Sequence, residues 1–191
     1  FKAENTVTKT AQKAEYQKES TSKDTQYEML KSLELTEDNF KELANYARKN
    51  GIMFLSSPFD KESVDLLDEM DVPAFKVASG ELTNFPLLKY IASKGKPIIL
   101  STGMATLGEI EEALNVIKEQ GVKDIIILHC ITSYPAKVED VNLRAIQTLK
   151  HVFKLPVGFS DHTLGILIPI AAVALGAVVI EKHFTLDKSL P

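Results

Sequence analysis

The sequence predicts an α/β fold of the (β/α)8 (TIM) barrel type, on three observations. Six short apolar runs alternate with helix-like segments at a spacing of roughly 20 to 30 residues, the size of a βα unit. The runs are continuously apolar, as in strands that are covered on both faces. Polar side chains follow each run directly, where a barrel places its ligand site. An open doubly wound sheet has the same local pattern, but no GxGxxG motif follows the first run.

The composition indicates a globular domain without a preference for polyanionic partners. The 191 residues are 45% hydrophobic and 25% charged, with 26 acidic and 22 basic side chains and a net charge of −4. No basic cluster indicates binding to nucleic acid or to an anionic membrane surface. The most apolar stretch, 166–180, is too short to span a bilayer. The single Cys130 excludes an internal disulfide and fits a reducing cytosol, so a cytoplasmic location is expected.

The first part of the chain changes from a polar segment to regular structure. Residues 1–31 show little apolar periodicity, which predicts a long loop with helical turns. Thr36 is placed to cap the first regular helix, and Gly51 is placed to end it. Residues 52–55 form the first predicted strand, and Asp60 can cap the helix that follows.

The same unit then recurs through the rest of the chain. Thr106 and Glu109 have the spacing of a capping box, which marks the start of one of the helices. Strands are predicted at 74–78, 97–100, 125–128, 156–159 and 177–180, and helices at 84–94, 106–121, 143–153 and 166–175.

Polar side chains gather at the predicted carboxyl ends of the strands, which meet at one rim of a barrel. Hydroxyls, a lysine and nearby glycines suit a phosphate or carboxylate ligand. Each serine alone could equally be a turn or cap residue. Lys76 is more informative, because it lies inside an apolar run, where its ammonium must find a partner. The full set is Ser56, Ser57, Lys76, Ser79, Glu81, Ser101, Thr102, His129, Thr132, Tyr134, Ser160, Asp161, His162, Glu181 and His183.

Two histidines, His162 and His183, occupy matching positions after consecutive apolar runs. If those runs are neighbouring parallel strands, both imidazoles emerge at one edge and could share a divalent metal. Either residue could instead be a hydrogen-bonded structural histidine. No HExxH or CxxC motif completes a zinc site, so a hard cation such as Mn²⁺ or Mg²⁺ suits the pair better.

Six motifs in a fixed order resemble the sialic acid synthase family, and the resemblance covers essentially the whole chain. Enzymes of this family condense phosphoenolpyruvate with N-acetylmannosamine or a related amino sugar, giving N-acetylneuraminate or a related nonulosonic acid and phosphate. The motifs are SSPFD at 56–60, FKVASGELTNFPLL at 75–88, KPIILSTGM at 96–104, LHCITSYP at 128–135, GFSDHT at 158–163 and IEKHFTLD at 180–187.

The resemblance implies a transferase on a (β/α)8 barrel that uses a divalent metal, Mn²⁺ or Mg²⁺. His162 and His183 match the metal ligands, and Glu81 and Tyr134 match residues on the sugar side, as catalytic candidates. The positions that match phosphoenolpyruvate-binding residues are Ser57, Lys76, Ser79, Ser101, Thr132 and Ser160. Relatives often read STPF at the first motif, and the Thr132 position can hold Asn in some of them.

The resemblance also implies that the chain is an internal portion of a longer synthase that forms a homodimer. Residues 1–31 would be the loop after the second strand, and 52–187 would carry strands three to eight. The first two strands, with a Lys-x-Gln-Thr segment, and a C-terminal antifreeze-like domain are expected outside it. The chain alone would then be an incomplete catalyst. Two alternatives stay open: another barrel aldolase or lyase acting on a phosphorylated sugar, and a non-catalytic barrel fragment that serves as a binding module.

Overall fold

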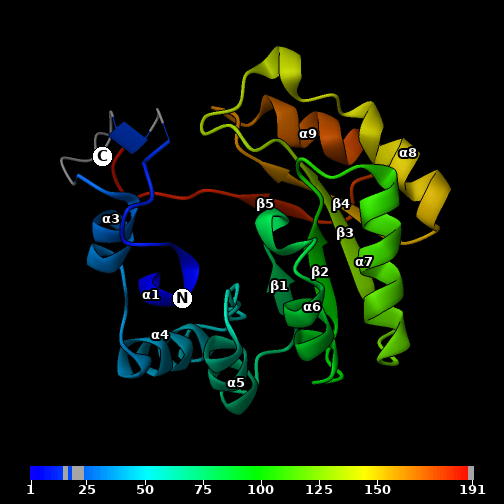
Figure 1. The fold of residues 1–191 in the computed structure, drawn as a ribbon. Coiled ribbons are helices and arrows are strands. Elements are labelled where there is room, and N and C mark those ends of the chain that lie inside the picture. Colours follow the sequence, from blue (N-terminus) through cyan, green and yellow to red (C-terminus); the bar gives the residue numbers. More distant parts are fainter. Residues whose placement is uncertain (15–16, 19–23, 189–191) are drawn as a thin grey trace. The chain divides into compact units, whose positions relative to one another are not determined.

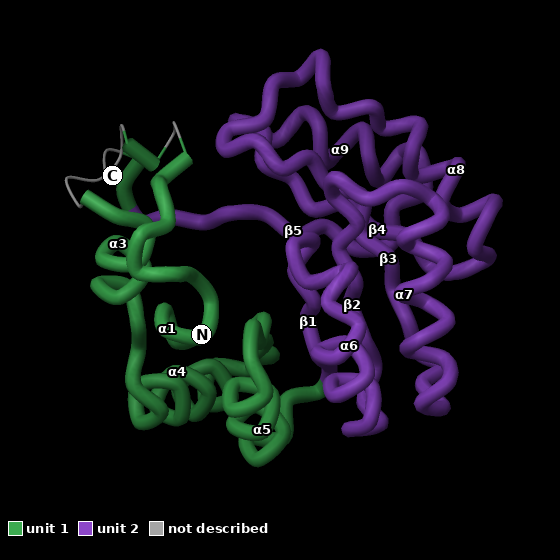
Figure 2. The backbone as a smooth tube through the Cα atoms, in the orientation of Figure 1, with its two compact units in different colours: residues 1–73, 187–191 green, residues 74–186 purple. Residues whose placement is uncertain are grey.

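The protein is described by a computed structural model that covers residues 1–14, 17–18 and 24–188. The chain forms two compact units (Figure 2). Unit 1 comprises residues 1–73 together with the residues from 187 onward, and unit 2 comprises residues 74–186. Unit 2 contains the sheet and, apart from Ser56 and Ser57, every residue of the predicted polar rim.

Unit 2 is a five-stranded parallel sheet whose spatial order equals its order in the sequence. A helix follows each of the first four strands, and right-handed crossovers in this order place all four helices on one face of the sheet (Figure 1). The arrangement is half of a (β/α)8 barrel, which confirms the predicted fold class. The strands are β1 (Phe75–Val77), β2 (Ile98–Ser101), β3 (Ile125–Cys130), β4 (Val157–Asp161) and β5 (Ile180–Lys182), and the helices are α6 (Phe85–Ala92), α7 (Leu107–Glu119), α8 (Arg144–Phe153) and α9 (Leu167–Ala174).

The common register gives the sheet two different faces. Phe75 pairs with Ile98, and Val77 pairs with Leu100, so these four side chains share one face. All four are fully buried, as expected beneath the layer of helices. Lys76 lies between Phe75 and Val77 and therefore projects from the opposite face, which is the inside of the half-barrel.

Unit 1 has no strand among its described residues; its labelled helices are α1 (Ala3–Thr6), α3 (Gln26–Ser32), α4 (Glu37–Lys49) and α5 (Lys61–Glu69). The predicted caps are formed: Thr36 accepts a hydrogen bond from Asn39 N, and Asp60 accepts one from Ser63 N. Part of the loop predicted at residues 1–31, namely 15–16 and 19–23, lies outside the described residues.

The strand predicted at 52–55 is wrong, because in the described structure this segment is not part of a sheet. Ile52 N donates to Ala47 O at 2.9 Å and Gly51 N donates to Arg48 O at 3.1 Å, so the segment begins by closing α4. Gly51 adopts φ +69°, the left-handed conformation of a helix C-cap. Ile52 and Met53 are 64% and 74% exposed. Apolar residues indicated a strand, but strands are defined by ladder hydrogen bonds, and these residues make none within the described chain.

The last strand is displaced from its predicted position. Residues 177–180 were expected to form it, whereas β5 covers Ile180–Lys182. Pairing with β4 begins earlier through isolated bonds, as Val178 N donates to Val157 O at 2.9 Å. The displacement places Glu181 within the ladder, in register with Ser160 of β4.

None of the helices in the described parts of the chain has both the length and the hydrophobicity that crossing a membrane requires. The most apolar of them, α9, has only eight residues and therefore spans about 12 Å.

The capping box at the start of α7 generates a stability prediction. Thr106 Oγ1 accepts from Glu109 N, while the Glu109 carboxylate accepts from both Thr106 N and Thr106 Oγ1. We expect Thr106→Ala to lower the free energy of unfolding by about 1 kcal/mol, because Glu109 N loses its acceptor and the Glu109 carboxylate loses the hydroxyl donor. Thr106→Ser, which retains the hydroxyl, is the control and should cost little. Urea unfolding measures both, and equal stability of all three proteins would contradict the prediction.

His129 generates a prediction about pH. Its ring packs against Phe159, and Nε2 lies 2.7 Å from Val141 O, which can only accept. Burial lowers the pKa of His129, and the hydrogen bond to Val141 opposes this shift without cancelling it. As the pH falls through about 6.5, the unfolded chain therefore binds a proton that the folded one does not, and stability should fall.

The test is urea unfolding of the unmodified protein and of His129→Gln at about pH 7.5 and about pH 5.5, on either side of the ordinary imidazole value. Glutamine keeps a donor for Val141 O but does not titrate in this range. We expect the variant to lose less stability on acidification. An equal loss in both proteins would show that other groups carry the dependence.

Candidate functional site

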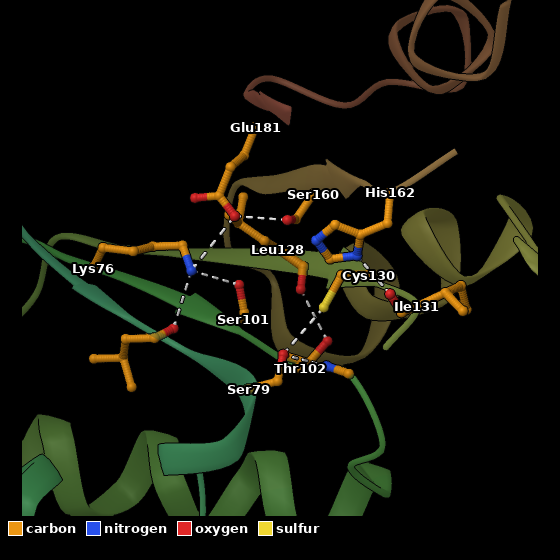
Figure 3. A network of polar contacts seen from close by, with 12 residues as sticks. Lys76, Ser79, Ser101, Thr102, Leu128, Cys130, Ile131, Ser160, His162 and Glu181 are labelled. Carbon is orange, nitrogen blue, oxygen red and sulfur yellow. Dashed lines mark hydrogen bonds and ion pairs between the residues drawn. The ribbon is translucent and has the colours of Figure 1, made fainter. Parts of the chain in front are cut away.

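The inner face of the half-barrel holds a cluster of polar side chains around Lys76 (Figure 3). Lys76 is only 9% exposed, and its Nζ donates to Ser101 Oγ at 2.9 Å and to Val77 O at 3.3 Å. Glu181 Oε1 lies 3.6 Å from the same nitrogen. The ammonium that the sequence places inside an apolar run is therefore fully partnered, as burial requires.

Glu181 joins this cluster to the end of β4. Ser160 Oγ donates to Glu181 Oε1 at 2.6 Å, and the carboxylate side chain remains 43% exposed. We call Lys76, Ser101, Ser160 and Glu181 the lysine cluster. From the sequence, Glu181 was placed among the polar residues of the rim but was assigned no catalytic or binding role. A signal for such a role was present, because Glu181 precedes His183 by two positions as Ser160 precedes His162, and a spacing of two keeps one face of a strand.

A second polar group lies beside the lysine cluster, at the ends of β1, β2 and β3. Gly103 N donates to Ser79 Oγ at 3.0 Å, and Ser79 Oγ lies 3.1 Å from Cys130 Sγ. A Cβ on Gly103 would come within 2.7 Å of Thr132 Cγ2 and 2.9 Å of Cys130 Sγ. The turn after β2 therefore needs glycine because side chains crowd it, and its φ is not in the left-handed region.

The two predicted metal-ligand histidines lie together. Their ring centroids are 5.3 Å apart, and the ring of Tyr134 lies 4.3 Å from that of His162 and 5.9 Å from that of His183. Tyr134 is 40% exposed and precedes Pro135 through a cis peptide bond. The described structure thus brings the sugar-side tyrosine of the sequence prediction to the histidine pair.

The loop after β3 fixes the orientation of His162. Its Nδ1 lies 2.6 Å from Ile131 O, and Ala136 N donates to the His162 carbonyl at 2.9 Å. A carbonyl only accepts, so Nδ1 carries the proton and Nε2 keeps a lone pair. Burial lowers the pKa of His162; the bond to Ile131 O opposes this shift, and His183 adds to it. The neutral imidazole that a metal requires is therefore favoured.

A buried ion pair lies next to the histidines in the sequence. Asp161 is 1% exposed, and its Oδ2 is 2.5 Å from Lys182 Nζ. Oδ1 accepts from Thr163 N at 2.9 Å and from Thr163 Oγ1 at 2.8 Å, while Lys182 Nζ also donates to Thr163 O at 2.8 Å. Burial alone raises the pKa of Asp161, but Lys182 and Thr163 outweigh burial and lower the pKa.

Some predicted site residues are not joined to these groups. Ser57 belongs to unit 1, where it lines a hollow with Phe1 and Phe40. Glu81 ends a 3₁₀ turn (Ser79–Glu81), and its Oε2 accepts from Asn84 Nδ2 at 2.8 Å. Thr132 approaches the site through its methyl group, beside Gly103.

The arrangement combines two chemical capacities on one face of the sheet. The lysine cluster offers an ammonium and hydroxyls, the donors that an anion requires. The histidine pair offers two imidazoles that could ligate one metal. Among residues 1–14, 17–18 and 24–188, no group of three or more His, Cys, Asp or Glu side chains is arranged to hold a metal ion.

Comparison with known proteins gives several relatives that are named as synthases of nonulosonic acids. The chain is 58% identical to N,N′-diacetyllegionaminic acid synthase of Campylobacter jejuni, over 100% of this chain and 58% of that protein. It is 52% identical to the synthase of the same name from Legionella pneumophila, over 100% of this chain and 55% of that protein. The chain thus spans little more than half the length of these relatives.

A solved structure supports the same relationship. The N-acetylneuraminic acid synthetase of Leptospira borgpetersenii, solved with citrate, superposes with a TM-score of 0.83 at 41% identity, over 86% of this chain and 57% of that one. A family model for the NeuB family matches residues 1–191. The chain therefore belongs to the NeuB family of sialic and nonulosonic acid synthases.

Proposed function

We propose that the protein condenses phosphoenolpyruvate with an N-acetylated amino sugar to give a nonulosonic acid and phosphate. The observation that supports this most directly is the lysine cluster beside the histidine pair on one face of the half-barrel. The reaction needs donors for an anionic substrate next to a group that activates an aldehyde, and the site offers both. Because the chain spans little more than half of its relatives, the activity is proposed for the whole protein.

In this proposal the lysine cluster and the neighbouring Ser79 hold phosphoenolpyruvate. Lys76 and the hydroxyls of Ser79, Ser101 and Ser160 supply charge and hydrogen bonds to its phosphate and carboxylate. Lys76 is already oriented by Ser101 and Val77 O, so its side chain loses little conformational freedom when the substrate binds. In the structure the Glu181 carboxylate already contacts two of these donors, Lys76 Nζ and Ser160 Oγ. An arriving anion would take over these donors, and Glu181 would turn toward the solvent that already reaches it.

The proposed chemistry forms one carbon–carbon bond, and at C2 it replaces the carbon–oxygen bond to phosphate with one to the oxygen of water. C3 of phosphoenolpyruvate attacks the aldehyde carbon of the open-chain sugar, and the electron pair of the carbonyl becomes a hydroxyl after protonation. Water adds to C2, and the tetrahedral intermediate expels phosphate together with its bridging oxygen. Holding both reactants in one geometry converts a bimolecular encounter into an effectively unimolecular step.

His162 and His183 would hold a divalent cation, Mn²⁺ or Mg²⁺. The fit rests on the tautomer of His162. Its Nδ1–H donates to Ile131 O, so the lone pair of Nε2 is available to ligate a metal. Two protein ligands leave positions for water and substrate oxygens, which suits a hard cation. The chemistry that the metal supplies is Lewis-acid polarisation of the sugar aldehyde. Tyr134, in contact with both rings, is placed to orient the sugar, and Glu81 is the second candidate on that side.

The relatives favour a diacetamido sugar as the acceptor to try first. Two of them, at 58% and 52% identity over the full chain, are named for N,N′-diacetyllegionaminic acid. A nine-carbon acid with two acetamido groups, built from three-carbon phosphoenolpyruvate, requires a six-carbon diacetamido aldose. N-Acetylmannosamine is the comparison substrate, because it carries only one acetamido group.

The proposed function is tested on the whole protein, by phosphate release from phosphoenolpyruvate with Mn²⁺ and each sugar in turn. We expect release that requires the sugar and the metal, and that falls by at least about 100-fold in His162→Ala or His183→Ala, since loss of a ligand exceeds the usual effect of an outer-shell change. His151→Ala is the matched control, because this histidine is exposed on α8. A folded protein that binds Mn²⁺ but releases no phosphate with any amino sugar would overturn the proposal and favour a barrel that binds without catalysis.

Gly103 generates a prediction about phosphoenolpyruvate binding. Gly103→Ala places a methyl group against Thr132 and Cys130, and the resulting shift should displace the N–H that orients Ser79. We expect KM for phosphoenolpyruvate to rise about tenfold, which corresponds to about 1.4 kcal/mol. Gly108→Ala is the matched control, because its Cβ would come no closer than 3.9 Å to a neighbouring atom and alanine favours the α7 helix. An unchanged KM in Gly103→Ala would contradict this role.

A further inference from the structure

Two tripeptides at the ends of β4 and β5 match each other residue by residue. Ser160-Asp161-His162 lies beside Glu181-Lys182-His183, and the ladder pairs Ser160 with Glu181 and Asp161 with Lys182. Each position makes a cross-strand contact. The first pair forms a hydrogen bond of 2.6 Å, the second an ion pair of 2.5 Å, and the two histidine rings have centroids 5.3 Å apart. The histidine pair is thus the third step of a continuous ladder of side-chain contacts.

The ion pair of this ladder lies on the opposite face from the lysine cluster. Successive side chains of a strand alternate between faces, so Asp161 and Lys182 project away from the inner face that carries Ser160 and Glu181. The Asp161 side chain is 0% exposed and that of Lys182 is 29% exposed. Neither residue has a part in the proposed chemistry. Their conspicuous property is their place in the sequence, directly before each histidine.

Every polar atom of the Asp161 carboxylate is used locally. Oδ2 faces Lys182, and Oδ1 accepts two hydrogen bonds from Thr163. Lys182 Nζ returns to the same segment by donating to Thr163 O at 2.8 Å. The chain on both sides of His162 is therefore fastened to the residue that precedes His183. A carboxylate buried in this way is costly without its cation, so the pair strongly disfavours any register that separates the two residues.

We propose that the Asp161–Lys182 ion pair is a positioning device that sets the separation of His162 and His183 for a shared metal. The inference rests on the proposed metal site and adds residues that do not touch the metal. Fixing both strands one residue before each histidine removes sliding between β4 and β5. Without the pair, each imidazole would still be present, but the two rings would share a cation only in a fraction of the conformations sampled.

The experiment measures Mn²⁺ affinity directly, without turnover. Free Mn²⁺ is titrated by its electron paramagnetic resonance signal against the protein and its variants Lys182→Met and Asp161→Asn. We expect the dissociation constant to rise 10- to 100-fold in both variants, the range found when residues supporting metal ligands are removed. Lys182→Arg, which can retain the ion pair, should stay within a few-fold of the unmodified protein. Lys31→Met, which breaks the exposed Lys31–Glu34 pair of unit 1, is the matched control.

Circular dichroism and urea unfolding separate positioning from stability. If the ion pair only stabilises the fold, its removal would lower the free energy of unfolding but leave the Mn²⁺ affinity of the folded variants unchanged. That result would overturn the inference. If either variant fails to fold, Thr163→Val removes a single hydrogen bond to Asp161 and should weaken Mn²⁺ binding about threefold, or about 0.65 kcal/mol. Unchanged affinity in a folded Thr163→Val would then overturn it.

The inference and the proposed function fail differently. If the unmodified protein binds Mn²⁺ and the variants bind it equally well, the positioning role is wrong and the metal site stands. If the unmodified protein shows no Mn²⁺ binding, the metal site is wrong and the positioning role falls with it.

Discussion

The structure depends on one constraint, the common register of five parallel strands. Because side chains alternate along a strand, the register decides at once which residues face the helices and which face the inside of the half-barrel. Phe75, Val77 and Leu100 are assigned to the buried helix side, and Lys76 to the inner side. A slip of one residue between neighbouring strands would exchange these roles, burying an ammonium beneath the helices. The site is therefore as well defined as the core, because one register positions both.

Under the proposed function, the lysine cluster keeps the charge of Lys76 partnered within the protein until an anionic substrate binds. Lys76 has three donors, and Ser101, Val77 O and Glu181 satisfy them within the protein. An anion that enters must replace the Glu181 carboxylate, so it gains a preoriented ammonium but has to displace a negative charge. Glu181 is able to move because its side chain is 43% exposed, whereas Lys76 is buried and hydrogen-bonded to Ser101 and Val77 O. Under the proposed function, such a site would discriminate against weak anions, since only a ligand with more charge or more acceptors than one carboxylate competes well.

Much of the fold and of the candidate site could be predicted from the sequence. The capping box at Thr106 and the polar ends of the strands follow from local rules, and both were found. The strand expected at 52–55 was wrong because apolarity does not report whether a backbone partner exists. Glu181 was placed at the rim but given no role, because its pairing with Ser160 depends on β5 beginning three residues later than its apolar run suggested. The ion pair of Asp161 with Lys182 could not be predicted from local sequence patterns, because a cross-strand contact depends on the register between two segments.

The groups that would bind the sugar under the proposed function lie on loops, so we expect the choice of acceptor to depend on the loops more than on the sheet. Under the proposed function, phosphoenolpyruvate and the metal are common to every nonulosonic acid, and the groups that would bind them come from strands or from their first residues beyond: Lys76, Ser101, Ser160, His162 and His183. The sugar candidates, Tyr134 and Glu81, lie instead on the loop after β3 and the turn after β1. Loops change with less effect on a fold than strands do, because no common register constrains them. Relatives named for legionaminic and for neuraminic acid can therefore share one sheet while differing in the loops above it, so the substrate of this protein should be sought by exchanging those loops.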